Sequence, residues 1–255
     1  MLGKLLKYEL KATGRTFLPL YGAILVVSLF FRIGQAFRIQ LDLFDFIIAM
    51  VLFGLLVALG VMTILVTIQR FRNNLLSDEG YLMFTLPVST YSLILSKLIT
   101  TILWLIASVF VSVLSFFILF VSRDFLLHLG EFWRELQVYL PQVPGEYWLV
   151  IVQVLLVCLI GFISFVIMIY ASLSVAQIAV FHAHRGIVAF GTFFILNIIT
   201  SILSAPIGYL IEIDINSAVS AVNLYLGITN LFGLVITAVL FFVTNYLLSH
   251  HLNID

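Results

Sequence analysis

The chain has 255 residues, of which 63% are hydrophobic and only 9% are charged, and its mean hydropathy is +1.23. A soluble protein this apolar would lack the polar surface that keeps it dispersed, so the composition predicts an all-α integral membrane protein. Twelve basic and twelve acidic residues balance each other. This balance excludes the strongly basic surface that nucleic-acid binding needs.

Residues 1–15, MLGKLLKYELKATGR, precede the first apolar run. On a helical wheel their leucines share one arc, and Lys4, Lys7 and Lys11 share the opposite arc. This pattern is typical of an amphipathic helix that lies in the membrane interface. Glu9 falls within the leucine arc, so this residue departs from the amphipathic pattern. A secretory signal peptide is not predicted, because the charged region is long and no small-residue cleavage site follows the apolar run.

Six apolar stretches follow, each long enough to cross a hydrocarbon layer ~30 Å thick as a helix. They cover residues 16–37, 44–70, 91–122, 147–181, 187–211 and 219–248. We expect the 35-residue stretch 147–181 to tilt or to project into water, because it exceeds the thickness of the layer.

Lysine and arginine are distributed unequally between the two sides that these six spans define. Eight fall on one side and four on the other, namely Lys4, Lys7, Lys11, Arg15, Arg70, Arg72, Lys97 and Arg185 against Arg32, Arg38, Arg123 and Arg134. Because basic residues are enriched in cytoplasmic loops, this count predicts that both termini and residues 71–90 are cytoplasmic.

The outside would then hold the longest polar connection, residues 123–146. Its apolar side chains recur every three or four residues, which predicts a helix lying on the membrane surface. These side chains are Leu126, Leu129, Trp133, Leu136 and Leu140, and Pro141 and Pro144 close the helix. For this connection we favour the role of a lid on the membrane surface over that of a receptor site.

The cytoplasmic stretch SDEGYLMFTLPVS, residues 77–89, is richer in signals than a plain connecting loop. Ser77 suits an N-cap, and the acids after it suit the positive end of a helix dipole. Pro87 stops the helix, so the sequence predicts a short helix over 77–87. Two interpretations are open: an interfacial helix that tucks its aromatic residues under the headgroups, or a knob whose aromatics fill a groove in a cytoplasmic partner.

These residues resemble the first cytoplasmic loop of ABC-2 type ABC-transporter permeases of Gram-positive bacteria, and KYEL at residues 7–10 resembles the N-terminal elbow helix of the same family. Six spans with both termini inside fit that family over essentially the whole chain. The resemblance implies a coupling helix held by the nucleotide-binding subunit. Its residues would be Asp78, Glu79, Gly80, Tyr81, Leu82, Phe84, Thr85, Leu86 and Pro87. Glu9 on the elbow helix would then face the ATPase.

The resemblance also implies a function, that of the permease subunit of an ABC exporter in a bacterial plasma membrane. The chain has no GxxxxGK[ST] loop, so ATP and Mg would bind a separate ATPase subunit, and a second permease copy would complete the transporter as a homodimer or heterodimer. An apolar interior suits a hydrophobic or amphipathic cargo, such as an antimicrobial or toxin peptide or a drug. The alternative is a non-transporting immunity or scaffold protein of the membrane that binds a peptide or a lipid.

The middles of the six spans carry amides and hydroxyls rather than ionisable groups, which ion-coupled carriers usually need. The amides are Gln153, Gln177, Asn197, Asn223, Asn230 and Asn245. Such side chains join helices at ~0.6–2 kcal/mol each, so packing is their default role. Asn197 and Asn223, on the last two spans, are the candidates for a translocation path.

No enzyme signature is present, since HExxH and GxSxG are both absent and no catalytic residue is predicted. His182 and His184 form an HxH pair with no nearby acid or cysteine, and beside Arg185 they suit interfacial anchors better than metal ligands. Cys158 stands alone in an apolar run. We therefore predict no metal site and no disulfide.

Overall fold

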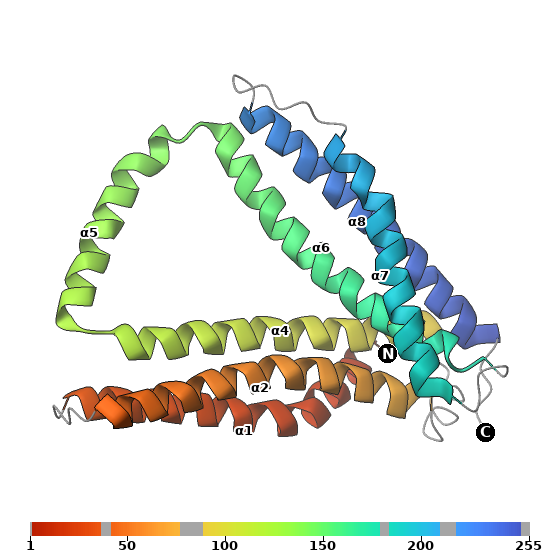
Figure 1. Ribbon diagram of the computed structural model, residues 1–255, viewed down its shortest axis with the longest axis horizontal. Coiled ribbons are helices and arrows are strands. Elements are labelled where there is room, and N and C mark those ends of the chain that lie inside the picture. Colours follow the sequence, from red (N-terminus) through yellow and green to blue (C-terminus); the bar gives the residue numbers. More distant parts are fainter. Residues whose placement is uncertain (1, 37–41, 77–88, 179–183, 210–217, 251–255) are drawn as a thin grey trace. The chain divides into compact units, whose positions relative to one another are not determined.

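The computed structural model describes residues 2–36, 42–76, 89–178, 184–209 and 218–250. These residues are almost entirely helical (Figure 1). The helices are α1 Leu2–Ala36, α2 Asp42–Leu75, α4 Thr90–Phe120, α5 Arg123–Tyr139, α6 Gly145–Val175, α7 Arg185–Tyr209 and α8 Ala218–His250, with a 3₁₀ turn at Leu140–Gln142 after α5. All of them except α5 are long and apolar enough to cross a membrane. The predicted all-helical architecture is confirmed, and its six long apolar helices are consistent with a multi-pass membrane protein.

The last five predicted spans match observed helices, with differences at their ends. In lipid every backbone N–H and C=O must be bonded within the segment, which favours long uninterrupted helices. α2 continues past residue 70 to Leu75, and α6 ends at Val175 rather than at 181. With 31 residues, α6 is still about 46 Å long and exceeds the hydrocarbon layer.

The predicted elbow helix is not confirmed as a separate element. Residues 2–15 are helical, but they run without interruption into the first span as the 35-residue helix α1. Pro19 lies inside this helix and leaves the carbonyl of Arg15 without its usual backbone donor. A proline in such a helix bends it rather than ending it when its surroundings hold both sides in place. The boundary predicted between residues 15 and 16 is therefore absent.

The chain divides into two compact units. Unit 1 comprises residues 1–69 and 95–140, and unit 2 comprises residues 70–94 and 141–255. The core of unit 1 lies among α1, α2 and α4, where buried apolar side chains form one cluster. Its members are Phe17, Tyr21 and Ile24 of α1, Leu59 and Val66 of α2, and Val111 of α4.

Within unit 1, α1 and α4 pack side by side and run in the same direction. The hydroxyl of Tyr21 lies 2.9 Å from that of Ser108, and the hydroxyl of Ser28 lies 2.6 Å from that of Ser115. Both contacts advance by seven residues on both helices, which is the repeat of helices that pack in parallel with a small crossing angle.

Unit 2 contains a second parallel pair, α6 and α8, and α7 packs against both of them. The amide Nδ2 of Asn223 donates to the carbonyl of Glu146, and that of Asn230 donates to the carbonyl of Gln153. These contacts also advance by seven residues on both helices. Asn223 and Asn230 thus have the helix-joining role that the sequence favoured for the amide residues.

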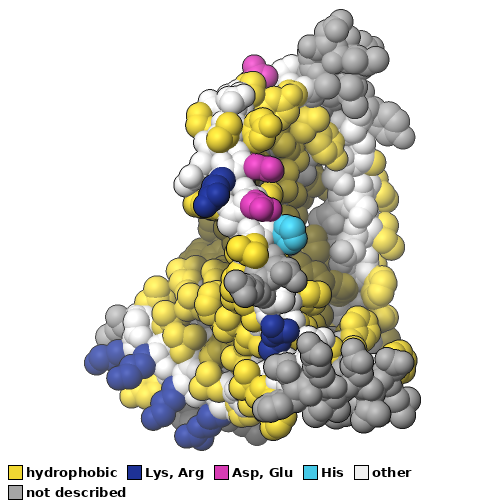
Figure 2. All heavy atoms as spheres, turned by 90° about the vertical axis from the view of Figure 1, so that its left-hand side faces the viewer, with side chains coloured by type: hydrophobic (Ala, Val, Ile, Leu, Met, Phe, Trp, Pro, Cys, Tyr) yellow, Lys and Arg dark blue, Asp and Glu magenta, His cyan; other side chains and the backbone are white. Residues whose placement is uncertain are grey.

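α5 confirms the helix predicted in the connection 123–146. Ser122 caps it, because its side chain accepts a hydrogen bond from the backbone N–H of Phe125. Phe132 and Trp133 are 59% and 60% exposed, so their apolar surface is not covered by the described residues. On the face of α5 seen in Figure 2, charged side chains and a histidine follow one another along the helix, with hydrophobic side chains beside them. This amphipathic pattern suits a helix at the membrane surface.

Candidate functional site

The predicted coupling residues, Asp78, Glu79, Gly80, Tyr81, Leu82, Phe84, Thr85, Leu86 and Pro87, lie outside the described residues. The helix ends on either side of them are described, and both are anchored in unit 2. Phe71 and Leu75 of α2 and Ile94 of α4 are 0% exposed. The ring of Phe71 stacks on that of Tyr170 of α6, with centroids 4.1 Å apart. Segment 77–88 is therefore bounded by two firmly packed helix ends.

The two helices that flank segment 77–88 belong to both units. Residues 70–75 of α2 and 90–94 of α4 cluster with unit 2, whereas the rest of each helix clusters with unit 1. Because both helices are continuous across these positions, a force applied to segment 77–88 reaches both units through covalent structure.

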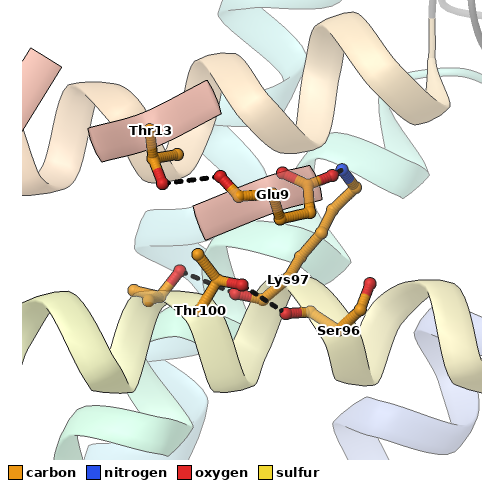
Figure 3. Close-up of polar contacts among 6 residues, drawn as sticks. Glu9, Thr13, Ser96, Lys97 and Thr100 are labelled. Carbon is orange, nitrogen blue, oxygen red and sulfur yellow. Dashed lines mark hydrogen bonds and ion pairs between the residues drawn. The ribbon is translucent and has the colours of Figure 1, made fainter. Parts of the chain in front are cut away.

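A buried ion pair joins α1 to α4 two turns beyond that segment. The ammonium Nζ of Lys97 donates to Oε1 of Glu9 at 2.6 Å, and the two side chains are 4% and 10% exposed (Figure 3). An isolated charge in apolar surroundings is costly, whereas a paired one is tolerated. Glu9 therefore lies within the leucine arc because its carboxylate meets a cation of the same unit.

Beyond the ion pair, hydrogen bonds continue along α1 and α4. Trp104 Nε1 donates to the hydroxyl of Thr13 at 2.6 Å, and that hydroxyl donates to the carbonyl of Glu9 at 2.7 Å. The ring of Trp104 also stacks on Phe17, with centroids 4.8 Å apart. Together with the Tyr21–Ser108 and Ser28–Ser115 contacts, these bonds form a polar seam between two apolar helices.

The other residues predicted near the N-terminus and in the translocation path are described too. Lys4, Lys7 and Lys11 are exposed on α1, as an interfacial face requires. Asn197 Nδ2 donates to the carbonyl of Phe193 in its own helix, whereas Asn223 joins α8 to α6. The structure thus does not bring Asn197 and Asn223 together by any hydrogen bond between described residues.

Several amide oxygens in unit 2 are buried without a hydrogen-bond partner among the described residues. They include Oδ1 of Asn223 and of Asn230 and Oε1 of Gln153. Such acceptors destabilise a fold unless they are met by another donor. The α6–α8 pair therefore keeps hydrogen-bonding capacity beyond the bonds that join the two helices.

The side chains considered as metal ligands lie only partly within the described residues. No three side chains of His, Cys, Asp or Glu lie close enough there to share a metal ion. His184 is exposed, and its predicted neighbour His182 lies outside the described residues. Cys158 is an exposed free thiol.

Two features of the site were not predicted. The sequence places Lys97 among the cytoplasmic charges and gives no sign of its pairing with Glu9. The seven-residue spacing of Asn223, Asn230, Thr237 and Thr244 on α8 was visible in the sequence and would have indicated the seam with α6.

Comparison of the chain with models of known protein families, with curated proteins and with solved structures finds no match.

Proposed function

We propose that the chain is the permease subunit of an ABC exporter in a bacterial plasma membrane, with both termini in the cytoplasm. In this proposal segment 77–87 is a coupling helix held by a separate ATPase subunit, on which ATP and Mg are bound. A second permease copy completes the transporter, and the cargo is a hydrophobic or amphipathic peptide or drug.

The observation that supports the proposal most is the anchoring of the helix ends around segment 77–88. Phe71, Leu75 and Ile94 are fully buried on either side of it, and both flanking helices continue into the other unit. A partner that moves the segment would move the first turns of α4 with it. The Glu9–Lys97 pair would pass that movement to α1.

The arrangement of the spanning helices gives a second line of support. In each half of the chain three spanning helices follow one another, and the first and third pack in parallel. Three spans per half mean that the second half enters the membrane from the opposite side to the first. Repeats of opposite orientation are common in transporter folds, where rocking between halves alternates access to the cargo site.

The test is purification of the tagged full chain from its native membrane in mild detergent, followed by mass spectrometry of bound proteins. We expect a near-stoichiometric soluble protein that carries a GxxxxGK[ST] loop. Replacing Asp78, Glu79 and Gly80 together by alanine should remove it while the chain still inserts normally.

The matched control replaces three exposed residues of α5, Glu131, Arg134 and Glu135, by alanine and should keep the partner. Recovery of the folded chain alone would contradict the proposal. It would favour the non-transporting protein that binds a peptide or lipid.

A further inference from the structure

A pocket of about 570 Å³ opens among α1, α2 and α4 within unit 1. It lies where α1 and α4 end and α2 begins. Nine of its twelve lining residues are apolar, among them Phe31, Leu52, Leu56 and Phe116. Its volume falls in the range of sites that enclose a small ligand or one chain of a larger one.

The polar groups of the pocket gather at one end of it. Arg32 and Gln35 belong to the last turns of α1, and Ser122 follows the end of α4. The apolar lining extends away from these helix ends, and on α2 it runs from Ile48 to Leu56, about 12 Å along the helix axis. The pocket is therefore polar at its rim and apolar along its length.

The cation at the rim retains hydrogen-bonding capacity. Nη1 of Arg32 donates to Oε1 of Gln35 at 3.4 Å, which is a long and weak bond. A guanidinium has five N–H donors, and Arg32 makes no ion pair within the described part of the chain. Arginine is the side chain best suited to bind a phosphate through two parallel hydrogen bonds.

We propose that this pocket binds an anionic phospholipid, whose phosphate meets Arg32 and Gln35 and whose acyl chain lies along Leu52, Leu56 and Phe116. The apolar length of the pocket matches the acyl chain of that molecule, and the arginine at its rim matches the phosphate. The inference is independent of the export proposal, because it needs neither a partner subunit nor a cargo.

The test uses the purified full chain in detergent and phosphatidylglycerol with a photoreactive group in its acyl chain. After illumination, mass spectrometry locates the labelled peptides. We expect labelling around residues 48–56 and 116–120, and we expect unlabelled phosphatidylglycerol to compete better than phosphatidylcholine. One favourable contact between an arginine and an anionic headgroup corresponds to an affinity about fivefold higher for phosphatidylglycerol than for phosphatidylcholine.

Two variants separate the roles of charge and shape. Arg32→Gln should remove most of the preference for phosphatidylglycerol while labelling persists, whereas Arg134→Gln on exposed α5 should change nothing. Ala49→Trp fills the pocket and leaves Arg32 in place, so it should reduce labelling by both lipids. It also keeps the proposal testable if Arg32→Gln fails to fold. Equal competition by the two lipids, or labelling that Ala49→Trp does not reduce, would overturn the proposal.

Discussion

The carboxylate of Glu9 lies 2.6 Å from the ammonium of Lys97, although 88 residues separate them along the chain. Both side chains are almost fully enclosed, in a protein of which only 9% of the residues are charged. The pair joins α1 to α4 close to segment 77–88, so it links the N-terminal helix to the element that we propose is coupled to an ATPase.

We predict that Lys97→Met or Glu9→Gln alone strongly destabilises the protein, because each leaves one buried charge without its partner. Loss of one member of a buried pair costs about 3–5 kcal/mol. The double variant should recover much of that loss. The measurement is thermal unfolding of the four proteins in the same detergent. The control is Lys11→Met, which changes an exposed lysine of α1, the helix that carries Glu9. Additive effects of the two single changes would show that the pair does not form.

The parallel packing of α1 and α4 predicts a specific cross-link. With Cys158 replaced by alanine, Ser28→Cys with Ser115→Cys should form a disulfide under mild oxidation, because the two hydroxyl oxygens are 2.6 Å apart. Ser28→Cys with Ser112→Cys should react poorly, since residue 112 lies almost one turn away on α4. Gel mobility after proteolysis between the two helices reports the bond. Equal yields for both pairs would contradict the observed register.

A glycine of α8 predicts a matched pair of stability effects. A Cβ added at Gly233 would lie 2.9 Å from Cγ2 of Ile160 on α6, whereas one added at Gly161 would meet nothing within 4 Å. Gly233→Ala should therefore destabilise the α6–α8 pair by roughly 1–3 kcal/mol. Gly161→Ala should be neutral or slightly stabilising.

Thermal unfolding in detergent measures both effects. Ile160→Leu removes the Cγ2 methyl that the new Cβ would meet, so it should partly restore the stability of Gly233→Ala. If Gly233→Ala proved as stable as Gly161→Ala, the close approach of the two helices would be excluded.

The proposed orientation predicts which introduced cysteines are accessible from outside the cell. In a background without Cys158, a membrane-impermeant maleimide should label Gln137→Cys on α5 in intact cells. Lys7→Cys on α1 should react only after the membrane is permeabilised. Labelling of Lys7→Cys in intact cells would reverse the orientation inferred from the lysine and arginine count.

The positions of the helices could be predicted from the sequence because hydrophobic length alone determines a membrane span. The union of residues 2–15 with the first span could not be predicted, because three lysines before residue 15 look like a boundary although α1 continues through it. Gly14 lies beside Trp104 within the packed helix rather than in a turn, and Pro19 is accommodated inside it.

The candidate site was less accessible to prediction than the helices. A single sequence does not show which residues of two distant helices meet, so Lys97 was assigned to the cytoplasmic surface instead of to Glu9. The acids and aromatics of residues 78–87 were recognised by their own pattern. Their structure lies outside the described residues, and their role stays a prediction.

The most direct test of the central claim places a photo-crosslinking amino acid at Tyr81 in living cells, with Trp133 on α5 as the control position. If segment 77–87 is held by an ATPase subunit, position 81 should form a covalent adduct with a soluble protein that carries a GxxxxGK[ST] loop, and position 133 should not. Adducts of position 81 with lipid alone would contradict the claim and would identify the segment as an interfacial helix.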